Sequence, residues 1–226
     1  PLAAASGRWA CSTPNMQQIP RDPEFRCAFT APPGRVLVNC DYSGQELRIV
    51  AAVTKEERLL SAFAEGDDPH ITTAALMFNV AYNMVTKEQR QAGKSCNFSM
   101  AFATSAGGLL NFFAASGQFI TLAQARDFRS RWLRAYPQIA KWHQECQRRA
   151  DAQLEVRTII GRRRHLYKED NRLNTHANSE IQGCGADVMK AALIEIHRKR
   201  PKTARLIATI HDSVMVECDE ADGEAV

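Results

Sequence analysis

Two aspartates, each next to a run of strand-forming residues, are the first sign of chemistry in this sequence. Asp41 follows the apolar run 36–38, and Asp212 lies between the apolar stretches 206–210 and 214–216. Aspartate is common in tight turns because its side chain bonds nearby backbone N–H groups, so Asp212 alone has a purely structural explanation. Two strand-end carboxylates from distant parts of a chain suit Mg²⁺, which takes oxygen ligands and shares them with substrate phosphates. The pair therefore predicts a metal site for phosphate chemistry.

A second chemical pattern lies in residues 87–103, KEQRQAGKSCNFSMAFA. Arg90, Lys94, Phe98 and Phe102 recur every fourth residue, which places them along one slowly rotating helix face. The two cations repel each other at this spacing, and an anion between them would remove the repulsion. Cations suit triphosphate oxygens and an aromatic ring suits stacking on a base. On this pattern alone, a solvated basic end that runs into a buried aromatic end remains an equal alternative.

The apolar periodicity predicts the elements that must position these residues. A strand is expected at 35–41 and a helix from Gln45, followed by mainly helical structure to Asp151 with breaks near 66–69, 107–108 and Gly117. The stretch EVRTIIGRRRHLY predicts a short strand, a glycine turn and a basic run. The order of these elements favours an α+β fold, with sheet at both ends of the chain and a helical insertion between them.

The last third of the chain predicts a helix and then a hairpin at 205–218 with His211-Asp212 at its tip. The apolar face of the helix is expected to comprise Ile181, Cys184, Val188, Met189, Ala192, Leu193 and Ile196. The pattern Ser179-x-x-Gln182 also fits a helix capping box.

Composition narrows the class of protein. The 226 residues carry a net charge of +4, and residues 126–172 hold 13 Lys or Arg against 6 Asp or Glu, which suits a polyanion-binding surface. Seven cysteines without a C-x-x-C pair favour reduced thiols over a disulfide framework or a zinc module. No apolar run is long enough to span a membrane and no signal peptide is visible, so we expect a cytoplasmic protein without a membrane partner.

In combination, the motifs DYSGQELR, R-x-x-x-K-x-x-x-F and HD resemble motifs A, B and C of the family A DNA polymerases, the bacterial DNA polymerase I type. The resemblance extends to SGRWACSTPNMQQIPRD, FAEGDDPHITTAALMF, RAYPQIAKW and NSEIQGCGADVMK, and so covers nearly the whole chain. It implies an antiparallel palm sheet with a large helical fingers insertion. The implied limits are 1–44 for the first part of the palm, 45–175 for the fingers and 176–226 for the rest of the palm, with the thumb and any exonuclease domain outside the chain.

The resemblance implies template-directed addition of deoxynucleoside triphosphates to a primer 3′-hydroxyl, in DNA replication or repair, by a monomer. Two Mg²⁺ ions are expected on Asp41 and Asp212, with Tyr42 at the same metal site. Arg90 and Lys94 match the phosphate-binding pair, and Lys94 is also assigned to catalysis. The residues expected at the incoming nucleotide are Phe98, Phe102 and Glu46, the last as a steric gate against the ribose 2′-hydroxyl.

Primer-template DNA is the implied macromolecular partner. Arg8 and Gln182 match residues that contact the minor groove, where hydrogen-bond donors test pair geometry without reading sequence. His211 matches a residue near the primer terminus, although packing in the turn is a comparable explanation. The other residues implied to contact nucleic acid are Asn15 and Gln17 near the start of the chain, and Arg162 and Arg163 in the basic run.

The sequence departs from the family pattern at four positions. Ser213 stands where the family usually has glutamate, which removes one carboxylate near the metals. Phe102 stands where tyrosine is typical, and Ser99 and Ala103 stand where glycine is common. These departures affect fidelity, sugar selection and rate more than the type of reaction.

Three other classes of protein share part of the pattern. A non-catalytic primer-template-binding protein would have no reason to keep both aspartates. A single-subunit RNA polymerase shares the aspartates and a comparable helix, but a ribose-accepting site should not carry an acidic gate at Glu46. A metal-dependent nuclease has no need for the face formed by Arg90, Lys94 and Phe98.

Overall fold

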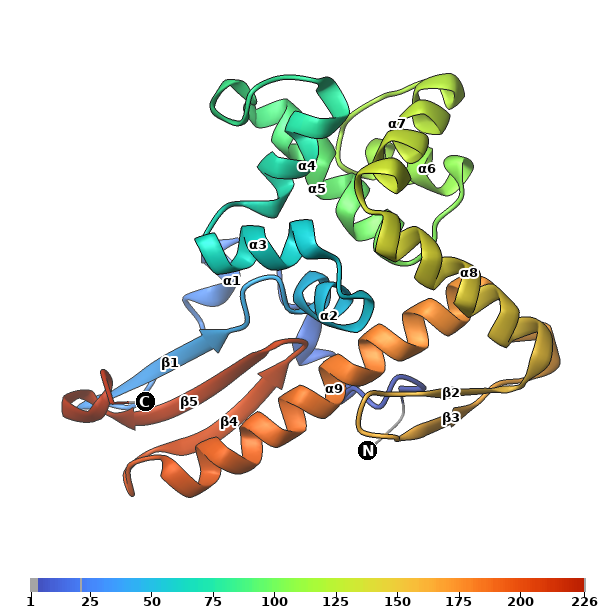
Figure 1. Ribbon diagram of the computed structural model, residues 1–226. Helices are drawn as coiled ribbons and strands as arrows, with labels where there is room; N and C mark the ends of the chain where they lie inside the picture. Colours follow the sequence, from blue (N-terminus) through green and yellow to red (C-terminus); the bar gives the residue numbers. More distant parts are fainter. Residues whose placement is uncertain (1–3, 21, 226) are drawn as a thin grey trace. The chain divides into compact units, whose positions relative to one another are not determined.

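The computed structural model of the protein describes residues 4–20 and 22–225. The chain divides into two compact units, one formed by residues 1–45 and 182–226 and the other by residues 46–181. These limits describe compact units of the fold and do not test the predicted domains. The palm and fingers limits of 1–44, 45–175 and 176–226 therefore stay a prediction. The α+β class is confirmed, because a small antiparallel sheet lies at the two ends of the chain and helices lie between them (Figure 1).

The first unit, called the sheet unit below, contains one three-stranded sheet. Its elements are η1 (Met16–Gln18), α1 (Pro23–Arg26), β1 (Arg35–Asp41), the C-terminal part of α9 (Leu173–Lys199), β4 (Arg205–Ile210), β5 (Ser213–Asp219) and η4 (Glu220–Asp222). The sheet order is β1-β5-β4, with both pairs of strands antiparallel. The predicted strand at 35–41 and the predicted hairpin at 205–218 are both confirmed.

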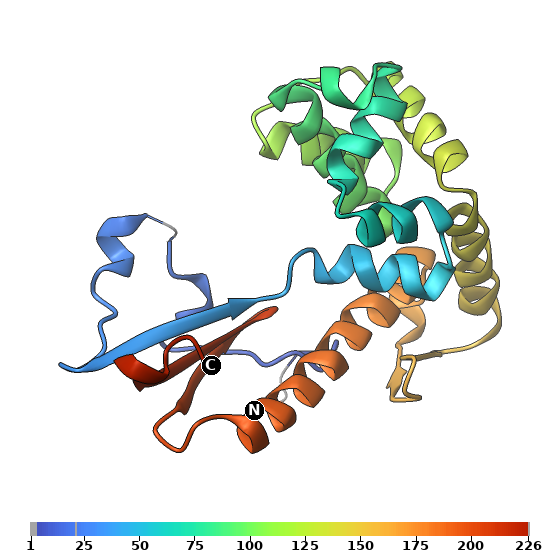
Figure 2. The same cartoon turned by 60° about the vertical axis from the view of Figure 1, so that its left-hand side comes forward.

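Alternation of apolar residues explains which face of this sheet is buried. Val36 and Val38 of β1 and Val214 and Val216 of β5 point to the same face, because side chains two apart share a side of a strand. They pack with residues of α9, including Met189, to form the core of the sheet unit. Figures 1 and 2 show the C-terminal part of α9 running along the sheet.

An ionic clamp at one end of the sheet joins β1 to β5. The Arg35 guanidinium donates to Glu217 Oε1 at 2.6 Å, to Asp219 Oδ1 at 2.5 Å and to the Thr203 carbonyl at 2.8 Å. The Arg35 and Glu217 side chains are only 20% and 17% exposed, so water screens their attraction less than it would at the surface. The clamp selects the register in which Arg35 pairs with Asp219 and Asp41 pairs with Ser213.

The second unit, called the helical unit below, is built mainly from helices. Its elements are α2 (Gln45–Thr54), which begins at the unit boundary, α3 (Glu57–Glu65), α4 (Pro69–Phe78), η2 (Tyr82–Met84), α5 (Lys87–Ala101), α6 (Ala106–Ala115), α7 (Leu122–Ala135), α8 (Pro137–Ala152), β2 (Glu155–Arg157), β3 (Arg163–His165), η3 (Lys168–Asp170) and the N-terminal part of α9. Helices α4 to α7 pack together as one group (Figure 2). Helices α4 and α5 approach so closely that a Cβ on Gly93 would lie 2.3 Å from the His70 carbonyl oxygen.

The helix breaks follow local capping chemistry. The break at 66–69 is confirmed, with Gly66 in the left-handed region at φ +78° and Asp68 accepting hydrogen bonds at the start of α4. A break at Gly117 is also confirmed. The predicted break near 107–108 exists but lies at residues 102–105, between α5 and α6, so the two glycines belong to the first turn of α6. Ser105 caps that turn by accepting from the Gly108 N–H at 3.2 Å.

Helix α9 corrects two predictions. Ser179 is not a cap, because it lies well inside the helix and its hydroxyl donates to the Thr175 carbonyl at 2.5 Å. Val188 does not belong to the buried face, since it is 41% exposed, whereas Ile181, Cys184 and Met189 are buried. Periodicity alone does not indicate this exposure, because at about 100° per residue Val188 lies within about 20° of Ile181 around the helix, so its exposure depends on what packs against that turn.

The stretch 155–167 forms a hairpin of β2 and β3 with Gly161 in the turn at φ +85°. The basic run is itself the second strand, because Arg163 pairs with Arg157 and His165 pairs with Glu155. Glu155 lies 2.7 Å from Arg157, which offsets part of the crowded positive charge.

All seven cysteines are free thiols, as predicted. Burial raises the pKa of Cys96 to about 12, and burial is also the main cause that raises the pKa of Cys146 to about 11. Both thiols therefore stay protonated and unreactive at neutral pH. In the described part of the chain, none of the helices is both long and apolar enough to cross a membrane.

The Arg35 clamp leads to a prediction about stability. Arg35→Met should lower the free energy of unfolding by about 1 to 3 kcal/mol, because two half-buried carboxylates lose a charged hydrogen-bond donor. Urea denaturation followed by circular dichroism measures the change. Arg26→Met, at an exposed arginine of α1 in the same unit, is the control. Equal stability of the two variants would show that the clamp contributes nothing.

Candidate functional site

The register of the sheet brings the two predicted metal-binding aspartates together. Asp41 is the last residue of β1 and pairs with Ser213, the residue that follows Asp212. The Tyr42 backbone N–H donates to the Asp212 carbonyl at 3.1 Å, which extends the pairing by one step beyond the strand. Asp41 and Tyr42 are exposed and Asp212 is half-buried, so this end of the sheet is open to a ligand.

A tight turn presents Asp212. Ile210 pairs with Ser213, which leaves His211 and Asp212 as the two turn residues. His211 has φ +57°, a left-handed conformation that costs a non-glycine residue about 1 to 2 kcal/mol. The Ser213 hydroxyl donates to the Ile210 carbonyl at 3.0 Å and closes the turn. The residue that replaces the usual glutamate therefore stabilises the hairpin instead of adding a carboxylate.

The donor set at Asp41 and Asp212 fits magnesium. In the described residues, no group of three or more His, Cys, Asp and Glu side chains is arranged to hold a metal ion. Mg²⁺ rarely needs such a protein cage, because it is usually held by one or two carboxylates together with waters and substrate phosphates. Two carboxylates on paired strands, with the Tyr42 backbone beside them, match that mode of binding.

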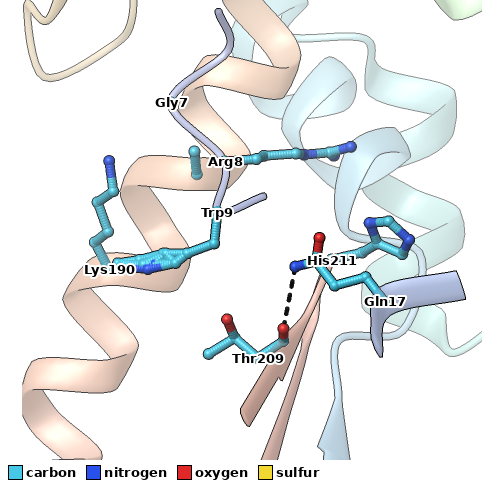
Figure 3. Close-up of a pocket in the computed structure, with 8 residues that line it drawn as sticks. Gly7, Arg8, Trp9, Gln17, Lys190, Thr209 and His211 are labelled. Atoms are coloured by element: carbon cyan, nitrogen blue, oxygen red, sulfur yellow. Dashed lines mark hydrogen bonds between the residues drawn. The ribbon is translucent and has the colours of Figure 1, made fainter. Parts of the chain in front are cut away.

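A pocket in the sheet unit gathers three of the predicted nucleic-acid-binding residues. Its lining comprises Gly7, Arg8, Trp9, Gln17, Ala186, Lys190, Thr209 and His211. The Gln17 amide donates to the Thr209 carbonyl at 3.2 Å and so ties the irregular N-terminal segment to β4. Figure 3 shows the Arg8 side chain reaching toward the imidazole of His211. The sequence analysis did not predict Trp9 or Lys190, because neither belongs to a regular pattern of charged or aromatic residues. Both lie in the stretches SGRWACSTPNMQQIPRD and NSEIQGCGADVMK that resemble the family.

The other predicted nucleic-acid-binding residues lie outside this pocket. Asn15 caps η1 by accepting from the Gln17 N–H at 3.1 Å, and Gln182 is a half-buried residue of α9. Arg162 and Arg163 lie on the β2–β3 hairpin of the helical unit, where Arg163 is exposed. Their neighbour Arg164 donates to the Ser179 hydroxyl at 2.6 Å and so anchors this hairpin to α9.

Helix α5 carries the predicted phosphate-binding face. Arg90 donates to Asp68 Oδ2 at 2.7 Å, and Lys94 lies 5.9 Å from the centre of the Phe98 ring. Partial burial works to raise the pKa of Asp68, but hydrogen bonds from Arg90 and the His70 N–H outweigh it and lower the pKa. An anion of the protein itself therefore relieves the repulsion between the two cations.

A second pocket, in the helical unit, contains the predicted nucleotide residues. Glu46, Phe98 and Phe102 line it together with Leu47, His70, Asn97 and Ala101. His70 was not predicted, although it lies in the quoted motif FAEGDDPHITTAALMF. Its ring centre is 5.8 Å from that of Phe98. Burial is the main cause that lowers the pKa of His70 to about 4. The negative charge of Asp68 works to raise this pKa, and the positive charges of Arg90 and Lys94 lower it further.

Asn97 holds this pocket in place through a buried network. Its Oδ1 accepts from Thr73 Oγ1 at 2.9 Å and from Trp132 Nε1 at 2.8 Å. An indole can only donate, which identifies Oδ1 as the acceptor and leaves Nδ2 as the donor. Asn97 Nδ2 lies 3.1 Å from His70 Nδ1. Because Nδ2 is the donor, His70 Nδ1 must be the acceptor and must carry a lone pair. The network joins α4, α5 and α7 and keeps His70 neutral.

The three departures at the end of α5 have separate structural effects. Phe102 ends the helix as its C-cap residue and is one of the residues that line the pocket. Ser99 is fully buried, and its hydroxyl donates to the Ser95 carbonyl at 2.7 Å within the helix. Ala103 adopts φ +56°, the left-handed region that favours glycine, which explains why glycine suits this position better.

The whole chain matches one family model. Residues 1–226 match the model described as DNA polymerase family A. The DNA polymerase I of Aquifex aeolicus is 33% identical over 231 residues, which cover 100% of this chain and 39% of the relative. The thermostable DNA polymerase I of Thermus aquaticus is 33% identical over 237 residues, which cover 99% of this chain and 28% of the relative. The chain belongs to DNA polymerase family A and spans about a third of the length of these curated relatives.

A solved structure agrees with this assignment. The POL domain of Pol1 from M. smegmatis, in complex with DNA primer-template and dNTP, superposes with a TM-score of 0.86 at 28% sequence identity. The match covers 98% of this chain and 41% of that one. The resemblance inferred from the motifs is confirmed at the level of family and fold.

The depressed pKa of His70 predicts loss of stability in acid. The pKa is about 4 in the folded protein and 6.5 in the reference state, so the unfolded chain binds the proton more readily. Stability should fall as the pH decreases from about 6.5 to about 4. His70→Asn should flatten this slope in denaturation experiments over that range. An identical slope for His70→Asn would contradict the buried neutral histidine.

The left-handed conformation of Ala103 predicts a stabilising substitution. Ala103→Gly should raise the free energy of unfolding by about 0.5 to 1 kcal/mol, because relief of the strain exceeds the entropy cost of glycine. Ala114→Gly, inside α6 and exposed, should instead lower it by about 1 kcal/mol. Thermal unfolding of both variants tests the sign. Destabilisation by both would show that residue 103 has a conformation that alanine tolerates.

Proposed function

We propose that this chain carries out template-directed DNA synthesis, adding deoxynucleoside triphosphates to a primer 3′-hydroxyl. One observation supports this most strongly: in a member of DNA polymerase family A, the β1–β5 register sets Asp41 beside Asp212 at the open end of a sheet. The proposed partners are primer-template DNA and deoxynucleotides, the ligands of the M. smegmatis relative. The cellular role proposed is replication or repair, performed by a monomer.

The sheet unit would hold the metals and the primer. The proposed ligands of two Mg²⁺ ions are the carboxylates of Asp41 and Asp212 and the backbone carbonyl oxygen of Tyr42. When bound, such ions stabilise the charge on the attacking and leaving oxygens of a phosphoryl transfer. His211 would lie near the primer terminus, because its position next to Asp212 in a two-residue turn fixes it beside the carboxylates.

The helical unit would hold the incoming nucleotide. Lys94 and Arg90 would bind the triphosphate, with Lys94 nearer the reacting group and Arg90 oriented by Asp68. Phe98 and Phe102 offer apolar surface to the sugar and base, and His70 extends this surface as a neutral donor. Glu46 lines the same pocket, where its carboxylate would exclude a ribose 2′-hydroxyl.

The remaining contacts would hold the duplex. Arg8 and Gln17 share a pocket with His211, and Asn15 adjoins Gln17. Gln182 would supply a second minor-groove donor from α9. Arg162 and Arg163, on the hairpin, would meet the nucleic-acid backbone, since arginine matches the geometry of phosphate oxygens.

Replacing either aspartate tests the proposal. In the whole protein, Asp41→Asn or Asp212→Asn should slow primer extension by roughly a thousandfold or more, about 4 kcal/mol, because each removes a charged metal ligand. Primer-template affinity should change little. Single-turnover extension with Mg²⁺ measures the rate, and Glu220→Gln, an exposed carboxylate at the far end of β5, is the control. Near-normal extension by either aspartate variant would refute the proposal.

A further inference from the structure

A lysine and a tryptophan form a pair at the edge of the sheet-unit pocket. Trp9 belongs to the irregular N-terminal segment and Lys190 to α9, and the ammonium lies 5.6 Å from the centre of the indole. Figure 3 shows Lys190 rising from the helix beside the indole of Trp9, with Arg8 and His211 across the pocket. The pair joins two segments that are far apart in the sequence.

The lining of this pocket is rich in donors and poor in negative charge. Arg8 and Lys190 can only donate hydrogen bonds, and the Gln17 amide already donates to Thr209. None of the described residues that line the pocket is acidic. Side chains of this kind favour a ligand that carries acceptors and negative charge, such as a phosphodiester backbone.

The partner of Lys190 leaves its charge intact. An indole attracts a cation through its ring electrons but has no net charge, so it orients the ammonium without neutralising it. Lys199, on the same helix, is different, because its ammonium lies 3.3 Å from the Glu195 carboxylate. In the described part of the chain, no acidic side chain forms such an ion pair with Lys190. The two lysines thus differ in the charge that they offer to a polyanion.

We propose that Lys190, held by Trp9, binds a backbone phosphate of the primer-template duplex. The inference rests on the function proposed above and adds a contact to it. A lysine acts on phosphate as a point charge, so this contact should contribute affinity without sequence preference. Trp9 is a positioning residue, which sets where the ammonium lies.

The test is the salt dependence of primer-template binding by the whole protein. Each phosphate contact contributes roughly 0.9 to the slope of log K against log salt concentration, because binding releases counterions from DNA. Lys190→Met should therefore lower the slope by roughly 0.9 and weaken binding to duplexes of different sequence alike. Lys190→Arg should keep the slope, since it keeps the charge. Lys199→Met, on the same helix, should leave both affinity and slope as in the wild type.

The outcomes separate this inference from the proposed function. Absence of primer-template binding by the wild-type protein would refute the proposed function itself. Normal wild-type binding, together with an unchanged slope for Lys190→Met, would overturn only the phosphate contact. For the positioning role, Trp9→Phe should retain affinity better than Trp9→Ala, because it keeps a ring under the ammonium. Equal affinity of Trp9→Ala and wild type would overturn that role.

Discussion

The register between β1 and β5 is the constraint on which the sheet unit depends. The apolar alternation of the two strands excludes a slip of one residue, which would turn every side chain to the opposite face. It does not exclude a slip of two residues, because valine would still meet valine. Arg35 removes this ambiguity, since only one register lets it reach both Glu217 and Asp219. A charged clamp at one end of the strand thus determines which residues meet at the other end.

The helical unit relies on a different device, a single buried amide. Asn97 is 1% exposed, and its side chain bonds to groups on α4 and α7 through both its oxygen and its nitrogen. A buried amide with all its partners present specifies one arrangement of helices, because any shift leaves a polar group without a partner. The residue after it is Phe98, so the bonds that fix the helix packing also fix the backbone position from which this ring projects.

Much of this architecture could be predicted from the sequence, and the failures have identifiable causes. Strand β1 and the hairpin around Asp212 were predictable because alternation and turn chemistry are local signals. The first turn of α6 was missed because the cap formed by Ser105 outweighed the two glycines that follow it. Ser179 was misread as a cap because its pattern is the same at the start and in the middle of a helix.

The candidate site was predictable where residues carry charge in a motif and not where they act through contacts distant in sequence. Asp41 and Asp212 were found from their position at strand ends. Asn97 was missed because its role depends on Trp132, which lies 35 residues away along the chain. The pair of Trp9 and Lys190 was missed for the same reason, since neither residue has a local pattern that indicates the other.

The seven-residue length of β1 fixes the spacing between the residues at its two ends. Arg35 at one end and Asp41 at the other are six residues apart, an even number, so both side chains point to the same face of the sheet. Insertion or deletion of one residue would place Arg35 and Asp41 on opposite faces. Insertion or deletion of two residues would keep them on one face but would separate Arg35 from Glu217 and Asp219. Evolution can therefore exchange residues 36–40 for others that keep the apolar alternation but cannot change their number, and changes in chain length must be absorbed by loops elsewhere.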